Sequence, residues 1–240
     1  MIKKIITYSI VILMLVITLL NVSAQNNHKS NPNPMKSQPI PVASFKHTEI
    51  GNPAIKGVVS VLKDGLNITA GGADIWGVKD EFSFAYIERT GDFDIISRIE
   101  SLTAANQYTK AGLMARENLT AGCRHIYFQV FSDNSPRNKN NGGFEFQYRQ
   151  VKDSLMKAIY PKSFTGTPEF PVSFPSTWIR LQRVKNVFTG YCSTDGKGWK
   201  PYTTFTMELP DKIYLGLAVT SHNTDKSSTA KFRDIAEIKN

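Results

Sequence analysis

Cysteine and histidine are scarce in this sequence, which has two cysteines and four histidines among 240 residues. A zinc site needs several Cys or His ligands close together, but here only Cys123 and His125 are near neighbours. A serine hydrolase of the nucleophile-elbow type would show a Gly-x-Ser-x-Gly turn, and the sequence has none. The chain therefore lacks the sequence signals of zinc chemistry and of this class of hydrolase.

Long amphipathic helices are also missing, and short alternating strands take their place. In residues 81–87, Phe82, Phe84 and Tyr86 fall on one face and smaller residues on the other. The same alternation predicts further strands at 93–100, 110–116, 124–131, 143–151, 177–184, 187–193, 203–209, 212–220 and 229–238. This pattern, with its many Gly and Asn turns, predicts an all-β jelly-roll sandwich; a closed barrel is the alternative.

Turn residues predict how some of these strands connect. Asp195 and Gly196 supply the positive backbone angles of a tight hairpin after strand 187–193. Residues 89–92 form a short connection, which predicts a hairpin between segments 81–87 and 93–100. Residues 154–175, rich in Pro, Phe and Thr, are expected to form a long loop over one edge.

The N-terminal residues are typical of an exported protein. Lys3 and Lys4 precede an apolar run from Ile5 to Leu20, and small residues end this region at Ala24. The order predicts a signal peptide over residues 1–24 and a secreted or periplasmic protein with no membrane insertion after cleavage. The alternative is a retained membrane anchor, because the run approaches the roughly 20 residues of a spanning helix.

The segment after the signal is polar and rich in proline. Residues 25–41 consist largely of Asn, Pro, Ser, Lys and Gln, a composition that predicts a disordered tether. The remaining residues, 42–240, have the length of one all-β domain. We expect this domain to be a monomer.

The net charge of the chain indicates which classes of binding partner to expect. The net charge of +9 becomes +7 without Lys3 and Lys4, with 27 basic residues against 20 acidic ones. The basic residues are scattered and form no stripe, so we expect a solvated surface and no nucleic-acid partner.

In an exported chain Cys123 and Cys192 are a candidate disulfide, and two unrelated buried thiols are the alternative.

A series of motifs occurs in the order found in a known family. The motifs are Gly72-Ala73-Asp74-Ile75-Trp76-Gly77, Asp80 with Phe82 and Phe84, Gly91-Asp92-Phe93, Lys110 to Glu117, Trp178 to Leu181, Phe188 to Tyr191, Ser193 to Gly196 with Trp199, and Gly216 to Asn223. Over about residues 50–238 the chain thereby resembles a bacterial family of the concanavalin A-like lectin/glucanase superfamily, often labelled regulation-of-enolase-like or of unknown function. The resemblance implies a jelly roll of two antiparallel sheets, one of them concave. Relatives occur alone or attached to glycoside hydrolases, which implies contact with glycans.

Polar side chains occupy one face of two predicted strands. They are His125, Tyr127 and Gln129 on segment 124–131, and Glu145, Gln147 and Arg149 on segment 143–151. On the concave sheet these rows would form an open groove for a polysaccharide or glycan, with Trp76 and Arg116 as further candidate ligand-binding residues. A solvated outer sheet face is the alternative, since alternation of this kind always produces one.

Two carboxylates near a Gly-rich turn suggest a calcium site. Asp74 and Asp80 flank a Gly-rich turn and are a candidate calcium site, unless Asp74 only shapes the turn. We expect no other cofactor.

Enzymes of the superfamily carry Glu-x-Asp-x-x-Glu or Glu-x-Asp-x-Glu on one strand, and neither pattern occurs here. We therefore predict a non-catalytic carbohydrate-binding protein; the alternatives are a glycoside hydrolase or lyase with another carboxylate pair, and an envelope module that binds a protein.

Overall fold

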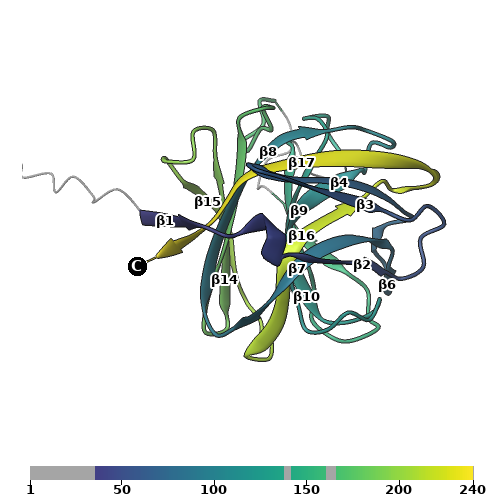
Figure 1. Ribbon diagram of the computed structural model, residues 1–240, viewed down its shortest axis with the longest axis horizontal. Coiled ribbons are helices and arrows are strands. Elements are labelled where there is room, and N and C mark those ends of the chain that lie inside the picture. Colours follow the sequence, from purple (N-terminus) through teal and green to yellow (C-terminus); the bar gives the residue numbers. More distant parts are fainter. Residues whose placement is uncertain (1–35, 138–141, 161–165, 240) are drawn as a thin grey trace, which may run out of the picture. The chain divides into compact units, whose positions relative to one another are not determined.

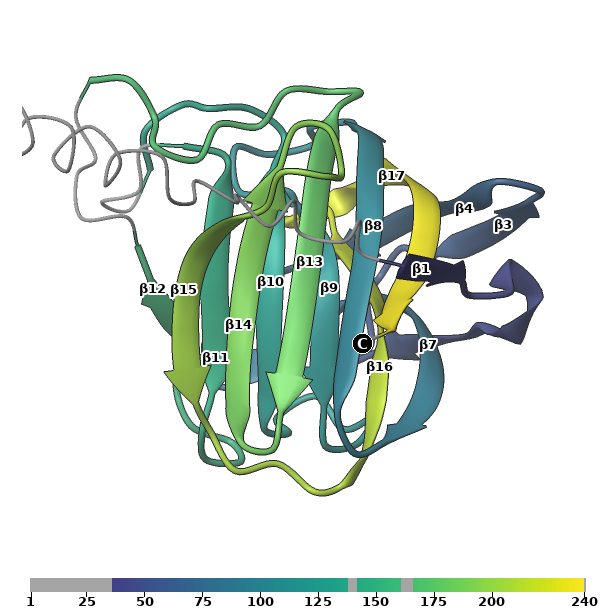
Figure 2. The same cartoon turned by 90° about the vertical axis from the view of Figure 1, so that its left-hand side faces the viewer.

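Two antiparallel β-sheets pack face to face (Figures 1 and 2). The computed structural model describes residues 36–137, 142–160 and 166–239. Sheet A contains, in spatial order, β15 (Lys200–Thr206), β14 (Val187–Ser193), β13 (Thr177–Val184), β8 (Phe93–Leu102), β17 (Asn223–Lys239), β4 (Gly65–Gly72) and β3 (Val58–Leu62), with β1 (Lys36–Pro39) also paired to β17. Sheet B contains β12 (Lys157–Ile159), β11 (Phe144–Arg149), β10 (His125–Phe131), β9 (Lys110–Arg116), β16 (Lys212–Thr220), β7 (Phe82–Thr90) and β2 (Lys46–Ile50).

Two small elements complete the described part of the chain. The hairpin of β5 (Ile75–Trp76) and β6 (Lys79–Asp80) lies between β4 and β7 in sequence, and the short 3-10 helix η1 (Val42–Ser44) lies between β1 and β2. Among the residues that the structure describes, no helix is long and apolar enough to cross a membrane. The fold is the predicted jelly-roll sandwich, and the alternative of a closed barrel is wrong, because each large sheet has two edge strands.

The main core lies between the inner faces of the two sheets. Figure 2 looks onto sheet A, with β9, β10 and β11 of sheet B behind it. Strand alternation turns Ile126, Phe128 and Val130 of β10 inward, where they join Ile179 and Leu181 of β13 in one buried cluster. Each such side chain contributes roughly 1.5–3 kcal/mol by leaving water.

Gly190 on β14 shows how closely the sheets approach. A Cβ at this position would lie 3.0 Å from the ring of Phe128. A larger residue at this position would therefore require the Phe128 ring to move by a few tenths of an ångström.

One predicted hairpin is confirmed and the other is wrong. Strands β14 and β15 pair antiparallel as predicted, but the six residues 194–199 join them and, of the Asp195-Gly196 pair, only Gly196 has a positive φ, of 70°, so the connection is wider than the predicted tight turn. Strand β7, however, pairs with β16 and β2 in sheet B, whereas β8 pairs with β13 and β17 in sheet A. The turn at Gly91 passes the chain from one sheet to the other, because both strands bury one face in the core between the sheets. The predicted loop 154–175 also contains a short strand, β12.

The N-terminal region differs from the predicted tether where the structure describes it. Strand β1 pairs with the end of β17, from Lys36 opposite Lys239 to Pro39 opposite Ala236. Strand β4 accompanies β17 only as far as Arg233, so β1 supplies backbone partners to the part of β17 that β4 does not reach. The predicted tether is therefore wrong for its last residues. The predicted signal peptide and residues 25–35 lie outside the described residues.

Cys123 and Cys192 are free thiols, so the predicted disulfide is wrong. Cys192 lies on β14 and faces the main core, whereas Cys123 lies in the turn before β10, where its thiol donates a hydrogen bond to the Asn118 carbonyl at 3.1 Å. The two residues belong to different parts of the sandwich. Burial also raises the pKa of the Cys192 thiol and keeps it protonated and unreactive.

We expect two titratable thiols per chain when the purified protein is denatured without reductant. The physical reason is that both side chains are buried apart from each other. Thiol titration with a chromogenic disulfide reagent measures this number. A value near zero would show that the two cysteines are bridged.

Candidate functional site

The two predicted polar rows lie side by side on the outer face of sheet B. Strands β10 and β11 pair with His125 opposite Arg149, Tyr127 opposite Gln147 and Gln129 opposite Glu145. Strand β9 extends the same face on the other side of β10, with Arg116 opposite His125. We call the outer face of β9, β10 and β11 the polar face. The sequence prediction that the rows share one surface is thus confirmed.

The polar face is closed, however, so the predicted open groove is wrong. His125, Tyr127, Gln129 and Arg149 are 0% exposed, and their neighbours Glu145 and Gln147 are 2% and 1% exposed. Part of the cover comes from the β5–β6 hairpin and from the loop 117–124, whose backbone groups bond to side chains of the face. These segments are distant in sequence from β10 and β11, and strand alternation alone does not reveal them.

One end of the polar face carries a fully buried group of charged residues, which we call the Asp80 cluster: Asp80, Arg116, His125 and Arg149. Arg149 donates two hydrogen bonds to the Asp80 carboxylate, at 2.8 and 2.7 Å. His125 Nδ1 lies 3.7 Å and Arg116 Nη2 3.9 Å from the same carboxylate. Asp80 is therefore the carboxylate around which two arginines and a histidine gather.

The two arginines of the cluster also hold the covering loops. Arg149 donates to the carbonyls of Gly77 and Ser154, and Arg116 donates to those of Asn118 and Thr120. The Arg116 guanidinium further lies over the rings of Phe82 and Phe84, at 5.1 and 5.9 Å. The cluster fastens the hairpin and two loops to the sheet, which is a structural task.

His125 is neutral within this cluster. Burial lowers the pKa of His125 to about 3, with Asp80 opposing the shift and Arg116 and Arg149 adding to it. Its Nδ1 lies 3.2 Å from the Cys123 carbonyl, which can only accept a hydrogen bond, so we assign the proton of the neutral ring to Nδ1. The structure therefore places His125, Arg116 and Arg149, three of the predicted ligand-binding residues, in a packed ion-pair network.

The other end of the polar face has polar atoms without protein partners. Among the residues that the structure describes, Gln129 Nε2 and Oε1 and Gln147 Oε1 are buried and make no hydrogen bond. We call Gln129 and Gln147 the amide pair. Each unsatisfied buried group costs about 1–3 kcal/mol, so partners such as water or ligand hydroxyls are energetically favoured there. The Gln147 amide nitrogen already donates one hydrogen bond, to Glu145 Oε1.

Next to the amide pair lies a rim formed by the half-buried residues Asp74, Trp76, Tyr108 and His222 and by the buried Lys110. Lys110 Nζ lies 2.6 Å from Asp74 Oδ1 and 5.6 Å from the centre of the Trp76 ring. His222 Nδ1 lies 3.1 Å from Asp74 Oδ2, and the Tyr108 ring lies 5.3 Å from that of His222. Lys110 is two residues before Gly112, which pairs with Gln129, so rim and amide pair are adjacent on the sheet.

The predicted calcium site does not fit these surroundings. Asp74 is already bound to Lys110 and faces His222, and Asp80 receives two hydrogen bonds from Arg149. Within the described ranges, no three His, Cys, Asp or Glu side chains gather as a metal site would require. Calcium needs six to eight oxygen ligands, and cations of the chain itself occupy both carboxylates. The alternative that Asp74 only shapes the turn fits better, because its Oδ1 also accepts a hydrogen bond from the Ile75 N–H at 2.7 Å.

The sequence prediction missed three rim residues: Tyr108, Lys110 and His222. Lys110 and His222 both lie inside motifs of the family resemblance, so the signal for them was present. Their function could not be read from alternation, because they stand at strand ends, where Lys110 begins β9 and His222 follows β16. Tyr108 lies in the loop before β9 and carried no signal.

Comparisons with known proteins bear on the fold. No family model matches the chain, and no curated protein is similar to it in sequence. A functionally unknown protein from Saccharomyces cerevisiae has a TM-score of 0.62 at 12% identity, with 83% of this chain and 98% of that chain covered. Lectin II from Ulex europaeus has 0.49 at 8% identity, covering 81% and 92%, and a xylan β-1,4-xylosidase from Bacillus halodurans has 0.47 at 13%, covering 73% and 33%. At such identities the first likeness shows a shared fold, and scores below 0.5 add nothing to it.

Proposed function

We propose that this protein binds carbohydrate without cleaving it, and that the amide pair and the rim beside it form the site. The observation that carries the proposal is the set of buried amide atoms without partners on Gln129 and Gln147. A sugar hydroxyl both donates and accepts hydrogen bonds, and a side-chain amide offers both functions in one plane. An unsatisfied amide pair is therefore matched to neighbouring hydroxyls of a sugar ring.

The rim supplies the aromatic surface that sugar recognition needs in addition to hydrogen bonds. Trp76 and Tyr108 are half-buried, so each retains part of an aromatic surface on which the C–H face of a sugar can lie. Lys110 and Asp74 hold each other in place at 2.6 Å, which fixes their positions beside the Trp76 ring. Because Gln129 and Gln147 are 0% and 1% exposed, the hydroxyls of a ligand at the rim would reach the amide pair only after the segments that cover it move aside.

The carboxylates near the site support binding over catalysis. A glycosidase needs a general acid with a raised pKa and a second carboxylate about 5–9.5 Å away. Burial alone would raise the pKa of Asp74, but the charges of Lys110 and His222 outweigh it and keep the pKa below its usual value. Asp74 is therefore not prepared to donate a proton at neutral pH. Asp80 is bound to Arg149.

We also propose that the chain belongs to the regulation-of-enolase-like family and is exported as a monomer. The ordered motifs and the jelly-roll fold support the family, and the apolar run after Lys3 and Lys4 supports export. Mass spectrometry of the protein made in its host would test export through the mass of its N-terminal peptide. A mature N-terminus at Gln25 would agree with the signal peptide, and an intact Met1 to Ala24 segment would contradict cleavage.

The carbohydrate proposal predicts opposite effects of Gln129→Leu on binding and on stability. Leucine removes two unsatisfied buried atoms, so the free energy of unfolding should rise by about 1 kcal/mol. Glycan binding should fall at least about tenfold, because a hydrogen-bonding pair is lost. Urea unfolding measures the first effect, and a glycan array followed by titration with the best glycan measures the second.

Gln182→Leu is the matched control for this test. Gln182 lies on the outer face of sheet A, donates to Asp94 at 2.7 Å and accepts from the Tyr191 hydroxyl at 3.2 Å. Its replacement should lower stability by about 1 kcal/mol and leave glycan binding unchanged. Absence of binding to every polysaccharide and glycan tested would contradict the proposed function, and release of new reducing ends would contradict its non-catalytic part.

A further inference from the structure

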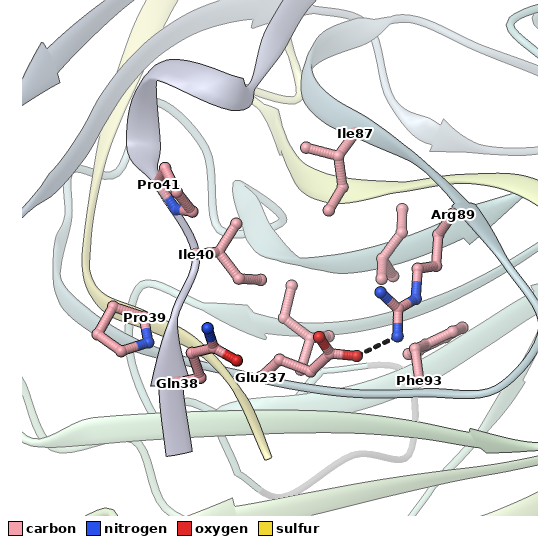
Figure 3. Close-up of a pocket in the computed structure, with 10 residues that line it drawn as sticks. Gln38, Pro39, Ile40, Pro41, Ile87, Arg89, Phe93 and Glu237 are labelled. Carbon is pink, nitrogen blue, oxygen red and sulfur yellow. Dashed lines mark hydrogen bonds and ion pairs between the residues drawn. The ribbon is translucent and has the colours of Figure 1, made fainter. Parts of the chain in front are cut away.

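A second site lies at an edge of the sandwich, away from the polar face. A cavity of about 210 Å³ opens where the segment from Gln38 to Pro41 crosses between the two sheets (Figure 3). Its other walls come from both sheets: Ile87 and Arg89 of β7, Phe93 and Ile95 of β8, Leu215 of β16 and Glu237 of β17. The cavity is thus built from four strands and one crossing segment.

The walls of the cavity are mainly apolar. Phe93, Ile95 and Leu215 are buried members of the main core, whereas Ile40 and Ile87 are half-buried and face the cavity from opposite sides. The half-buried pair leaves a way in from solvent. Apolar cavities of about 150 Å³ in proteins take up benzene, so this volume accommodates roughly six to eight non-hydrogen atoms.

One nitrogen atom in the cavity wall, Nε of Arg89, lacks a hydrogen-bond acceptor among the described residues. Arg89 Nη2 is paired with Glu237 Oε1 and donates to the Asp92 carbonyl at 3.3 Å. Arg89 Nε is buried and makes no hydrogen bond with any residue that the structure describes. A buried N–H without an acceptor is costly, so an acceptor from a ligand would be favoured at this end of the cavity.

The charges around Arg89 restrict the chemistry of that ligand. The Glu237 carboxylate is paired with both Arg89 and Lys239, so it already has its partners within the protein, and a charged ligand would have to lose its water in a mainly apolar cavity. The guanidinium in turn would repel a cation. The remaining class is an uncharged molecule whose oxygen accepts a hydrogen bond.

We infer that this cavity binds a small, uncharged, mainly apolar molecule whose carbonyl or hydroxyl oxygen accepts a hydrogen bond from Arg89 Nε. The apolar part lies between Ile40, Ile87 and the core residues, and the oxygen lies beside Arg89. The site is independent of the polar face and of the carbohydrate proposal. It also gives residues 38–41 a role as one wall of a binding site.

Cyclohexanone and toluene are suitable probes, because they have the same number of non-hydrogen atoms and only cyclohexanone has an acceptor oxygen. Titration of the ¹⁵N-labelled full chain, followed by amide chemical shifts, should show saturable binding of both. The shifted amides should lie in residues 38–41, 87–95, 213–217 and 235–238. Absence of saturable shifts, or shifts centred elsewhere, would overturn the inference.

Arg89→Lys tests the hydrogen bond separately from the cavity. Lysine retains a cation for Glu237 and removes the Nε donor. Cyclohexanone should then bind about tenfold more weakly, whereas toluene binding should stay unchanged and thereby report an intact cavity. Equal losses for the two probes, or no loss for either, would contradict the role of Arg89. Ile87→Phe, which fills a half-exposed side of the cavity, should abolish both.

Discussion

Replacing Asp80 with Asn is expected to lower the free energy of unfolding by about 3–5 kcal/mol, or to prevent folding at physiological temperature. Asp80 is 0% exposed and is the carboxylate closest to Arg149 and Arg116, whose side chains are also fully buried. Asparagine has almost the same shape but no charge. The substitution therefore leaves two buried guanidinium groups without a counter-charge, and the loss of that compensation sets the size of the effect.

Urea unfolding followed by tryptophan fluorescence measures this change, and Asp234→Asn is the matched control. Asp234 also binds an arginine, with Oδ2 2.6 Å from Arg98 Nε, but its side chain is 48% exposed. Water compensates an exposed charge, so this control should lose no more than about 1 kcal/mol. Similar losses for the two variants would show that burial of the Asp80 cluster is not what makes Asp80 important.

The fold was predictable because the strand pattern is local. Alternation alone gives the observed bounds of β9, β13, β14 and β16, and the Asp195-Gly196 turn gives the β14–β15 hairpin. Sheet membership is not local. The turn at Gly91 is equally compatible with a hairpin and with a crossing between sheets, and only the pairing of β8 with β13, more than seventy residues later, separates them.

The same limit explains the N-terminal segment. Residues 36–39 have the composition of a disordered tether and bury almost no side-chain surface. Their backbone is ordered because β17 extends past the end of β4 and presents unpaired groups to it. Composition measures what side chains can bury, and it carries no information on a backbone partner two hundred residues away.

The candidate site was also predictable only in part: the sequence indicates which residues share a face, but not whether that face is open. Period-two alternation correctly places Gln129 and Gln147 on one face, because it is a property of the strands themselves. Whether that face is open depends on segments elsewhere in the chain, such as the β5–β6 hairpin that Arg149 holds through the Gly77 carbonyl. The sequence showed polar side chains at both ends of the face, but only packing shows that one end holds the ion pairs of Asp80 and the other has the unsatisfied amides.

The Asp80 cluster also makes stability depend on acid in a specific range. Burial lowers the pKa of His125 to about 3, against 6.5 for an unperturbed histidine. Between these two values the unfolded chain binds a proton that the folded chain does not, so the free energy of unfolding falls as the pH falls. Each pH unit well inside this range costs about 1.4 kcal/mol, which amounts to about 2.5 kcal/mol between pH 6.5 and 4.5.

His125→Gln should remove this part of the pH dependence. The Gln side chain can still donate to the Cys123 carbonyl but has no proton to gain near neutral pH. Carboxylates whose pKa is lowered, such as Asp74 and Glu49, begin to lose their stabilising contribution as the pH falls through about 5 to 4, but this loss is common to the wild-type protein and the variant and cancels in the comparison. Urea unfolding at pH 6.5 and 4.5 should therefore show a loss in the wild-type protein that is about 2.5 kcal/mol larger than in the variant. Equal losses would mean that His125 takes up a proton inside the folded protein, next to two arginines, and that Asp80 compensates three positive charges instead of two.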